Sequence, residues 1–360
     1  MNKNTFFMAV MLFIGIVTAS AQEKKYSLYG IGFYNLENLF DTCHDEGHND
    51  YQYLPDGQNK WNGLKYTSKL RNMARVLSEM GTDKLPGIGC AAIGVSEVEN
   101  AKCLTDLCAQ GPLKARNFQF VHIEGPDQRG VDCALLYNPK LFQVRDVKLI
   151  PYVYVKPEDS LRATRGFLTV SGTMAGEHVT IIVNHLPSRF AGSFYREEGG
   201  RQIRIVKDSL LRDDPNVKLF IMGDMNDDPQ DKSMAEALGA RRKMKDLEAD
   251  GLWNPWWDVL ASGVGTLQYD GGWNLFDQII LSRSLLDLEH FKDVKKKPAL
   301  NKMDCSTLRY WDHQVFSRDY LFQNEGKYKG NTLRTHAGGT WLNGFSDHLP
   351  TVVYVIKEQK

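Results

Sequence analysis

Hydrophobic and polar positions change their spacing several times along the chain, and these changes predict alternating strands and helices. Apolar residues recur at helical spacing over residues 66–80 and 195–211, which predicts two amphipathic helices. Short apolar runs rich in β-branched residues, among them 131–137, 180–183 and 351–355, predict strands. Strands that alternate with helices in this way are typical of helices packed outside β-sheets.

One apolar run ends abruptly in polar residues that could carry chemistry. The run Ile221-Met222-Gly223 is followed by Asp224 and Asn226, which an extended strand would place on one face. The carboxylate could accept a proton while the amide holds the attacked atom. Taken alone, such an Asp-x-Asn is more often a turn whose side chains bond their own backbone.

Five further segments share this arrangement of an apolar run with polar residues inside it or directly after it. They are Asn35-Leu36-Glu37, Ser96-Glu97-Val98-Glu99-Asn100, Asn184-His185-Leu186-Pro187-Ser188, Asp277-Gln278-Ile279 and Ser346-Asp347-His348. A lone acidic residue after a strand usually caps a helix, and a lone histidine there is usually structural. Six such segments in one chain favour a shared site.

The order and spacing of these six motifs resemble the endonuclease/exonuclease/phosphatase superfamily, the deoxyribonuclease I-like metal-dependent phosphoesterases. The resemblance covers the chain from about residue 26 to the C-terminus. It implies an α/β fold, a four-layer sandwich of two packed mixed β-sheets flanked by helices. It also implies an active site at one end of the sandwich.

The resemblance implies a metal site built from oxygen ligands. Glu97 would be the main ligand, with Asn35, Glu37 and Asp347 contributing directly or through water. An all-oxygen set is the kind that Mg²⁺ prefers, with Mn²⁺ or Ca²⁺ as alternatives.

The same resemblance implies catalytic roles for five residues. Asp224 corresponds to the general base for the attacking water, and Asn226 would hold that water or a phosphoryl oxygen. His348 would donate to a non-bridging oxygen while Asp277 fixes its ring and raises its pKa. His185 would lie near the phosphate or the leaving group.

The charge balance does not single out a nucleic-acid-binding surface. Lysine plus arginine equals aspartate plus glutamate at 44 each, whereas duplex binders usually carry a basic stripe. Ser188, Arg129 and Arg189 are candidate phosphate contacts. Residues that could form a basic stripe are Arg162, Arg165, Arg189, Arg196, Arg201, Arg204, Arg241, Arg242, Lys243 and Lys245. Solvated helix faces explain each of them equally well.

Length and composition fit one large domain. The chain has 360 residues, of which 42% are hydrophobic, enough for a substantial core. We expect a single domain over 22–360 with insertions at about 241–273 and 284–344. The first insertion carries Trp253, Trp256, Trp257 and Trp273, and the second Lys295-Lys296-Lys297. Aromatic clusters of this kind form core or loop packing, or line a substrate groove.

The N-terminus predicts export. Lys3, an apolar stretch from Phe6 to Val17 and the small residues Ala19-Ser20-Ala21 form a signal-peptide pattern over residues 1–21. The apolar stretch is shorter than the roughly 18 to 20 residues that span a bilayer. We therefore expect a periplasmic or secreted protein without stable membrane insertion.

Six cysteines suit an oxidising compartment without requiring bridges. Cys90 and Cys133 lie in apolar runs and are expected to be buried thiols. Cys103 and Cys108 are close enough in sequence to pair, and the sequence leaves that pairing open.

Three functions are compatible with these observations. The leading interpretation is an exported phosphodiesterase, an endonuclease or exonuclease acting on extracellular DNA or RNA. The alternative is a phosphatase or phospholipase-like enzyme acting on sugar, inositol or lipid phosphates. A non-catalytic binding protein that keeps the fold is a remote third. No protein partner can be inferred.

Overall fold

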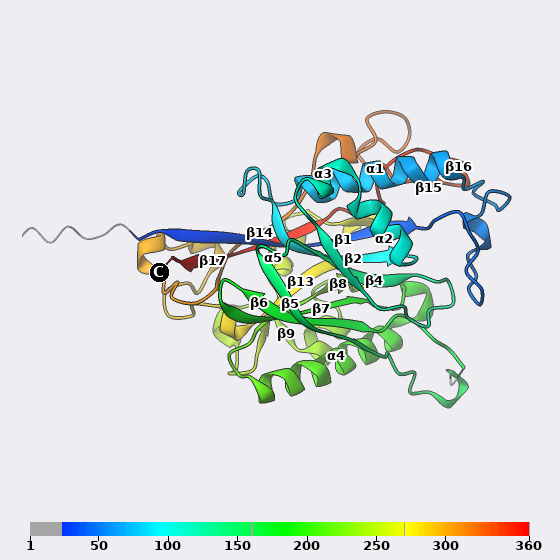
Figure 1. Ribbon diagram of the computed structural model, residues 1–360. Coiled ribbons are helices and arrows are strands. Elements are labelled where there is room, and N and C mark those ends of the chain that lie inside the picture. The colour runs from blue at the N-terminus through cyan, green and yellow to red at the C-terminus, as the bar shows by residue number, and fades with distance from the viewer. Residues whose placement is uncertain (1–23, 160, 270, 360) are drawn as a thin grey trace, which may run out of the picture.

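The computed structural model describes residues 24–159, 161–269 and 271–359. Two mixed β-sheets pack face to face, and helices cover both outer faces (Figure 1). The predicted four-layer α/β sandwich is therefore confirmed. The signal-peptide prediction concerns residues 1–21, which lie outside the described residues.

The first sheet has six strands, with the order β14-β17-β1-β2-β4-β3. These strands are β14 (Arg309–Val315), β17 (Thr351–Glu358), β1 (Tyr26–Leu39), β2 (Cys90–Val98), β4 (Asp132–Tyr137) and β3 (Gln119–His122). β1 and β2 are parallel, whereas β17 runs antiparallel to β1.

The second sheet has seven strands, with the order β5-β6-β7-β8-β13-β10-β9. They are β5 (Phe142–Ile150), β6 (Phe167–Met174), β7 (Glu177–His185), β8 (Lys218–Asp224), β13 (Asp277–Ser282), β10 (Leu252–Trp253) and β9 (Ala240–Arg241). β7 and β8 are parallel, and β13 runs antiparallel to β8. Two short hairpins lie outside the sheets, β11 (Leu267–Tyr269) with β12 (Gly272–Asn274) and β15 (His336–Ala337) with β16 (Thr340–Trp341).

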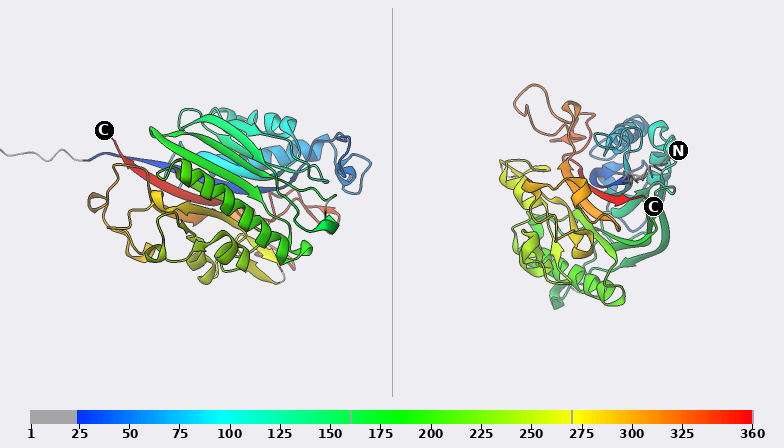
Figure 2. Two further views of the ribbon diagram at one scale, coloured as in Figure 1. Left: turned by 90° about the horizontal axis from the view of Figure 1, so that it is seen from below. Right: turned by 90° about the vertical axis from the view of Figure 1, so that its left-hand side faces the viewer.

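Helices form the two outer layers (Figure 2). α1 (Gly63–Glu79), α2 (Ala101–Cys108) and α3 (Gly111–Lys114) cover the first sheet, and α4 (Ser193–Asp213) covers the second. α5 (Trp256–Ala261) and a π-helical turn over Ser233–Leu238 follow β8 in the chain. Short 3-10 turns complete the connections: η1 (Tyr51–Tyr53), η2 (Pro157–Asp159), η3 (Arg189–Ala191), η5 (Met244–Asp246), η6 (Arg283–Leu285), η7 (Val294–Lys296), η8 (Leu300–Lys302) and η9 (Asp319–Leu321).

Three buried clusters correspond to the three interfaces between the four layers. One lies between the sheets and includes Phe33, Val183 and Met222. The other two pack α1 against the first sheet and α4 against the second. The sheets approach closely at Gly94, where a Cβ would come within 2.5 Å of the Met222 sulfur.

The carboxyl ends of the parallel strands meet at one end of the sandwich, on the right in Figure 1. β1 and β2 end there in the first sheet, and β7 and β8 end there in the second. Because β13 and β17 run the opposite way, their first residues lie at the same end. Helices long and apolar enough to cross a membrane are not found among the described residues.

All six cysteines are free thiols, so Cys103 and Cys108 do not form a bridge. Cys90 and Cys133 are buried, as the sequence predicts.

Candidate active site

The predicted catalytic residues converge on the Asp224 carboxylate at the end of β8. His185 and Asp277 lie directly beside Asp224 on the neighbouring strands, because their backbones pair with that residue. Asn35, at the end of β1 in the other sheet, donates from Nδ2 to Asp224 Oδ2 over 3.0 Å. This side-chain hydrogen bond joins the two sheets at the site.

Asp224 is 2% exposed. Its Oδ2 lies 3.5 Å from His185 Nε2 and 3.8 Å from His348 Nε2. Burial raises the pKa of Asp224 to about 7, although the charge of His348 opposes this shift. A carboxylate with this pKa can accept a proton near neutral pH.

His348 and Asp277 form the predicted pair. His348 Nδ1 and Asp277 Oδ2 are 2.7 Å apart. Burial alone would lower the pKa of His348, but the carboxylates of Asp277 and Asp224 outweigh it and hold that pKa well above its ordinary value. Asp277 is fully buried, and its Oδ1 has no hydrogen-bond partner among the described residues. The ring orientation of His348 is thus fixed, with Nε2 towards Asp224.

His185 faces Asp224 from the other side. Its Nε2 also lies 3.9 Å from Glu97 Oε1. Burial lowers the pKa of His185 well below its ordinary value, and the guanidinium groups of Arg165 and Arg129 add to that effect. The ring is therefore neutral at physiological pH.

Glu97 and Asp347 present the oxygen atoms that are free to bind a cation. Glu97 Oε2 accepts from the Asn38 backbone N–H over 3.0 Å, which leaves Oε1 without a hydrogen bond among the described residues. Asp347 Oδ2 accepts from Arg334 over 2.8 Å, and its Oδ1 lies 3.9 Å from His348 Nε2.

The other two predicted metal ligands already have partners. Glu37 accepts from Arg334 Nε over 2.9 Å and from the Thr335 backbone N–H over 2.6 Å. Asn35 Oδ1 accepts from the Glu37 backbone N–H over 2.8 Å. Both residues stay predicted ligands, because an oxygen that accepts one hydrogen bond keeps a further lone pair for a cation.

Two basic residues that the sequence analysis did not single out, Arg334 and Lys69, hold Glu37 and Asp347. Arg334 bridges the two carboxylates, and the buried Lys69 on α1 lies 3.7 Å from Glu37 Oε2. Burial lowers the pKa of Lys69 to about 8, against the raising effect of Glu37. No spacing pattern marks either residue in the sequence.

Several backbones at the site adopt the left-handed conformation that residues other than glycine rarely adopt. The φ angles of Glu37, Glu97 and Asn226 are 49°, 59° and 50°. Such conformations store local strain and concentrate at functional sites. The backbone conformation therefore marks the same site as the sequence motifs, on independent grounds.

Asn226 donates from Nδ2 to the Leu186 carbonyl over 2.9 Å. Its amide oxygen is therefore the atom left to orient a water molecule.

The three weaker candidates differ in their surroundings. Arg129 is 42% exposed and lies 3.8 Å from Glu97 Oε1. Arg189 bonds Asp228 over 3.2 Å and Asp231 over 3.0 Å. Ser188 is exposed on the segment after β7. Arg129 alone among them stands beside the predicted cation ligands.

Most arginines of the candidate basic stripe are also paired with acids. Arg165 bonds Asp127 over 2.9 Å, and both side chains are buried. Other pairs are Arg162 with Asp159, Arg196 with Asp227, Arg201 with Glu198 and Arg242 with Asp258. These pairs reduce the positive charge at the named arginines, whereas Lys243 and Lys245 of the same stripe form no ion pair with the described residues.

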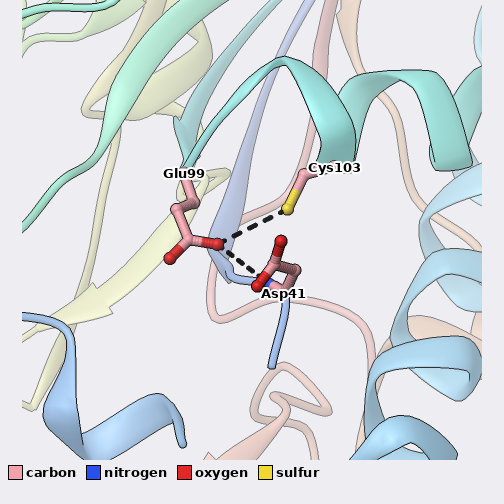
Figure 3. Close-up of side chains that lie close together, drawn as sticks. All are labelled: Asp41, Glu99 and Cys103. Carbon is pink, nitrogen blue, oxygen red and sulfur yellow. Dashed lines mark hydrogen bonds between the residues drawn. The ribbon is translucent and has the colours of Figure 1, made fainter. Parts of the chain in front are cut away.

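A second group of potential ligands, which the sequence analysis did not predict, lies nearby. Asp41, Glu99 and Cys103 are buried, with ligand atoms within 4.8 Å of one another. Glu99 Oε2 accepts from the Asp41 backbone N–H over 2.7 Å and lies 3.7 Å from Cys103 Sγ (Figure 3). Burial raises the pKa of Glu99 to about 8 and also raises that of the Cys103 thiol. Because a protonated thiol is a poor ligand, we assign no cation to this group.

Comparisons with known proteins concern the sequence family and the fold. A family model described as "Endonuclease/Exonuclease/phosphatase family" matches residues 30–357. A search of curated proteins finds no match.

Three solved structures illustrate the fold that this chain shares. An endonuclease/exonuclease/phosphatase family protein of Bacteroides thetaiotaomicron has 13% identity and a TM-score of 0.53, over 93% of this chain and 97% of that one. A mannosyl-6-phosphatase of the same organism has 14% identity and a TM-score of 0.53, over 91% and 99%. D. rerio TDP2, complexed with a single strand DNA product, has 14% identity and a TM-score of 0.50, over 91% and 99%. At these identities the likeness concerns the fold.

Proposed function

Because the chain belongs to the endonuclease/exonuclease/phosphatase family and is a phosphate-ester hydrolase, we propose that it hydrolyses small esters with an exposed terminal phosphate. The observation that carries this proposal is the pair of half-exposed arginines at the site. Arg129 lies beside Glu97 and Arg334 beside Asp347, with 42% and 43% of their side chains exposed. A terminal phosphate carries more negative charge than a diester, and planar guanidinium groups suit its oxygens.

The residues fit a divalent cation, on which enzymes of this family generally depend. Glu97 Oε1 and Asp347 Oδ1 would hold it, since both are oxygen donors without a hydrogen bond among the described residues. Mg²⁺ is the proposed ion, with Mn²⁺ or Ca²⁺ as alternatives. Such an ion would neutralise charge on a phosphoryl oxygen.

The side chains around Asp224 have complementary tasks. Asp224 Oδ2 would accept a proton from the attacking water, and the Asn226 amide oxygen would orient that water. His348 Nε2 would donate to a non-bridging oxygen, because its Nδ1 is already bonded to Asp277. His185 would contact the phosphate between Glu97 and Asp224.

A nuclease is the second candidate. D. rerio TDP2, complexed with a single strand DNA product, has the same fold, and nothing in the Asp224 site distinguishes a diester from a monoester. The ion pairs of the candidate basic stripe count against a long polynucleotide.

A substrate panel with a salt series separates these candidates. With Mg²⁺ present, the protein should hydrolyse sugar phosphates or other monoesters faster than a chromogenic diester, DNA or RNA. Added salt should lower this activity only modestly, whereas activity on a polynucleotide falls steeply in proportion to its phosphate contacts. Arg334→Gln should raise the KM for the monoester, and Arg201→Gln, at a surface ion pair, serves as the matched control. Activity confined to DNA or RNA would contradict the proposal.

We propose that the protein is exported to the periplasm or beyond. The support is the signal-peptide pattern over residues 1–21. N-terminal sequencing of the mature protein should begin at Gln22, and a cytoplasmic protein that keeps Met1 would refute export.

The metal role of Glu97 has its own test. Glu97→Gln keeps the shape of the side chain but removes the charge that attracts a hard cation. We expect the variant to need much more Mg²⁺ or Mn²⁺ for activity, and calorimetry should show a matching loss of Mn²⁺ affinity. Unchanged Mn²⁺ binding would reject Glu97 as a ligand.

A further inference from the structure

A cavity of about 530 Å³ lies between the two stretches that the sequence analysis reads as insertions. One wall comes from the segment around η5, β10 and α5, and the other from the segment around η7. Its size is within the range of small-molecule binding sites. The hydrolytic mechanism uses none of its residues.

The cavity lies away from the catalytic centre. β10 pairs with the end of β13, where Trp253 is opposite Leu281. Asp277 is the first residue of the same strand and lies opposite Asp224. At about 3.3 Å per residue, the four residues from Asp277 to Leu281 separate the two places by roughly 13 Å along the strand. A ligand in the cavity would not touch the hydrolytic residues.

Positive charge is concentrated at the cavity although the whole chain is neutral. Five basic residues line it, against two acidic ones. Arg242 is paired with Asp258 over 2.6 Å. The other four basic residues are exposed lysines that form no ion pair with the described part of the chain, namely Lys243, Lys245, Lys292 and Lys295. The lysines on both walls therefore leave a net positive charge at the cavity, although Asp293 also lines it.

Tryptophans form the apolar part of the cavity. Trp253 is held in place, since its Nε1 donates to the Arg242 carbonyl over 3.0 Å. Trp257 is partly exposed, and its Nε1 is buried without a hydrogen-bond partner among the described residues. The Arg242 guanidinium lies over the Trp257 ring, 6.0 Å from its centroid.

We propose that this cavity is a second ligand site, which binds a phosphate group carried by a ring. The lysines hold the phosphate and the tryptophan wall packs against the ring, which is either a nucleotide base or a sugar. The site is independent of which ester the catalytic centre hydrolyses.

Calorimetric titration of the full protein in metal-free buffer tests the proposal. The probes are adenosine 5′-monophosphate, glucose 6-phosphate and inorganic phosphate. At least one of the two ring-bearing probes should bind about 10-fold more tightly than inorganic phosphate, and the tighter probe identifies the ring. If neither exceeds inorganic phosphate, the proposal fails.

Variants locate the binding. Lys243→Glu with Lys292→Glu reverses one charge on each wall and should weaken binding at least 10-fold. Arg241→Glu with Lys296→Glu is the matched control, because it makes the same change in net charge on exposed residues that do not line the cavity. Equal losses in both double variants would show non-specific attraction and overturn the proposal.

Two further variants separate the cavity from the catalytic centre. Trp257→Ala removes the ring from the cavity wall, and it should weaken binding about 5-fold. Glu97→Gln should leave binding of the tighter probe within 2-fold. Loss of binding in Glu97→Gln would place the ligand at the catalytic centre and refute the second site, whether or not the proposed hydrolysis is correct.

Discussion

At the scale of single residues, Asp224 connects every part of the site. It receives a hydrogen bond from Asn35 across the two sheets and lies between His185 and His348. Its neighbours differ in charge state because burial lowers the pKa of His185, while Asp277 and Asp224 hold that of His348 high. One carboxylate thus lies between a neutral and a charged imidazole, an arrangement suited to moving a proton on one side and stabilising negative charge on the other.

His348 and Asp277 should act as a unit, because an orienting carboxylate loses its value once its imidazole is removed. Asp277→Asn and His348→Ala should each lower turnover by about 10² or more. The double variant should be barely worse than His348→Ala alone. Measuring the turnover of all three variants on one substrate gives the coupling energy between the two residues. Multiplicative losses of turnover would show that the 2.7 Å contact between them has no functional role.

The sequence identifies the residues around Asp224. It does not identify the two basic residues that hold the carboxylates of Glu37 and Asp347. Each predicted catalytic residue lies at or beside one end of a strand, where an apolar run begins or stops and can be recognised. Arg334 and Lys69 have no such mark. Arg334 is 297 positions from Glu37 in the chain, and Lys69 is 266 from Thr335. Contacts over such separations depend on how the layers pack, which no local spacing records.

At the scale of elements, the hydrophobic spacing predicts regular structure closely. The helix predicted over 66–80 is α1 at Gly63–Glu79, and the one predicted over 195–211 is α4 at Ser193–Asp213. The extra first turn of α1 follows from Asn62, whose side chain accepts from the Leu64 and Lys65 N–H groups. Capping sets the start of a helix independently of its apolar face.

The buried Asp127–Arg165 pair should fix the loop that carries Arg129. Arg165 also donates to the Leu186 carbonyl over 3.2 Å, and Asp127 accepts from the Arg129 backbone N–H over 2.9 Å. Arg165→Met leaves a buried carboxylate unpaired and should destabilise the protein by about 3–5 kcal/mol in urea unfolding.

A double variant and a surface control complete this test. The double variant Asp127→Asn with Arg165→Met should lose less unfolding free energy than Arg165→Met alone, because no unpaired charge remains in its interior. Arg201→Met, at a surface pair, should change stability by about 0.5 kcal/mol or less. Equal losses of unfolding free energy in the single and double variants would show that the unpaired Asp127 carboxylate does not destabilise the fold.

At the scale of the whole molecule, charge is distributed unevenly on a neutral chain. The end of the sandwich with Asp224 gathers carboxylates, each neutralised in part by arginine, lysine or histidine. The cavity away from that end gathers lysines without partners among the described residues. Net charge alone could not predict either feature, because equal totals conceal their separation.

Acid should destabilise the fold through His313. Burial lowers the pKa of His313 to about 4, although Asp312 and Asp258 oppose the shift and Lys297 and Lys84 add to it. The unfolded chain takes up this proton near pH 6.5 and the folded protein only near pH 4. This contribution to stability is therefore present above pH 6.5 and is lost as the pH falls towards 4.

Urea unfolding of the wild type and of His313→Gln checks this effect. Between pH 7.5 and 4.5 the wild type should lose about 2–3 kcal/mol more than the variant. Identical pH profiles for the two proteins would show that His313 does not titrate as its burial requires.

The role of Asp224 is tested most directly by the turnover of Asp224→Asn on one phosphate ester with Mg²⁺ and by the dissociation constant of that ester. We expect a 10²- to 10⁴-fold loss of turnover, the usual range for a lost general base, with an intact fold. Substrate binding should be unchanged or tighter, because removing a negative charge near a phosphate relieves about 1 kcal/mol of repulsion at 4 Å in water. Near-normal turnover would contradict a general-base role for Asp224, because the strand end there would then be only a turn.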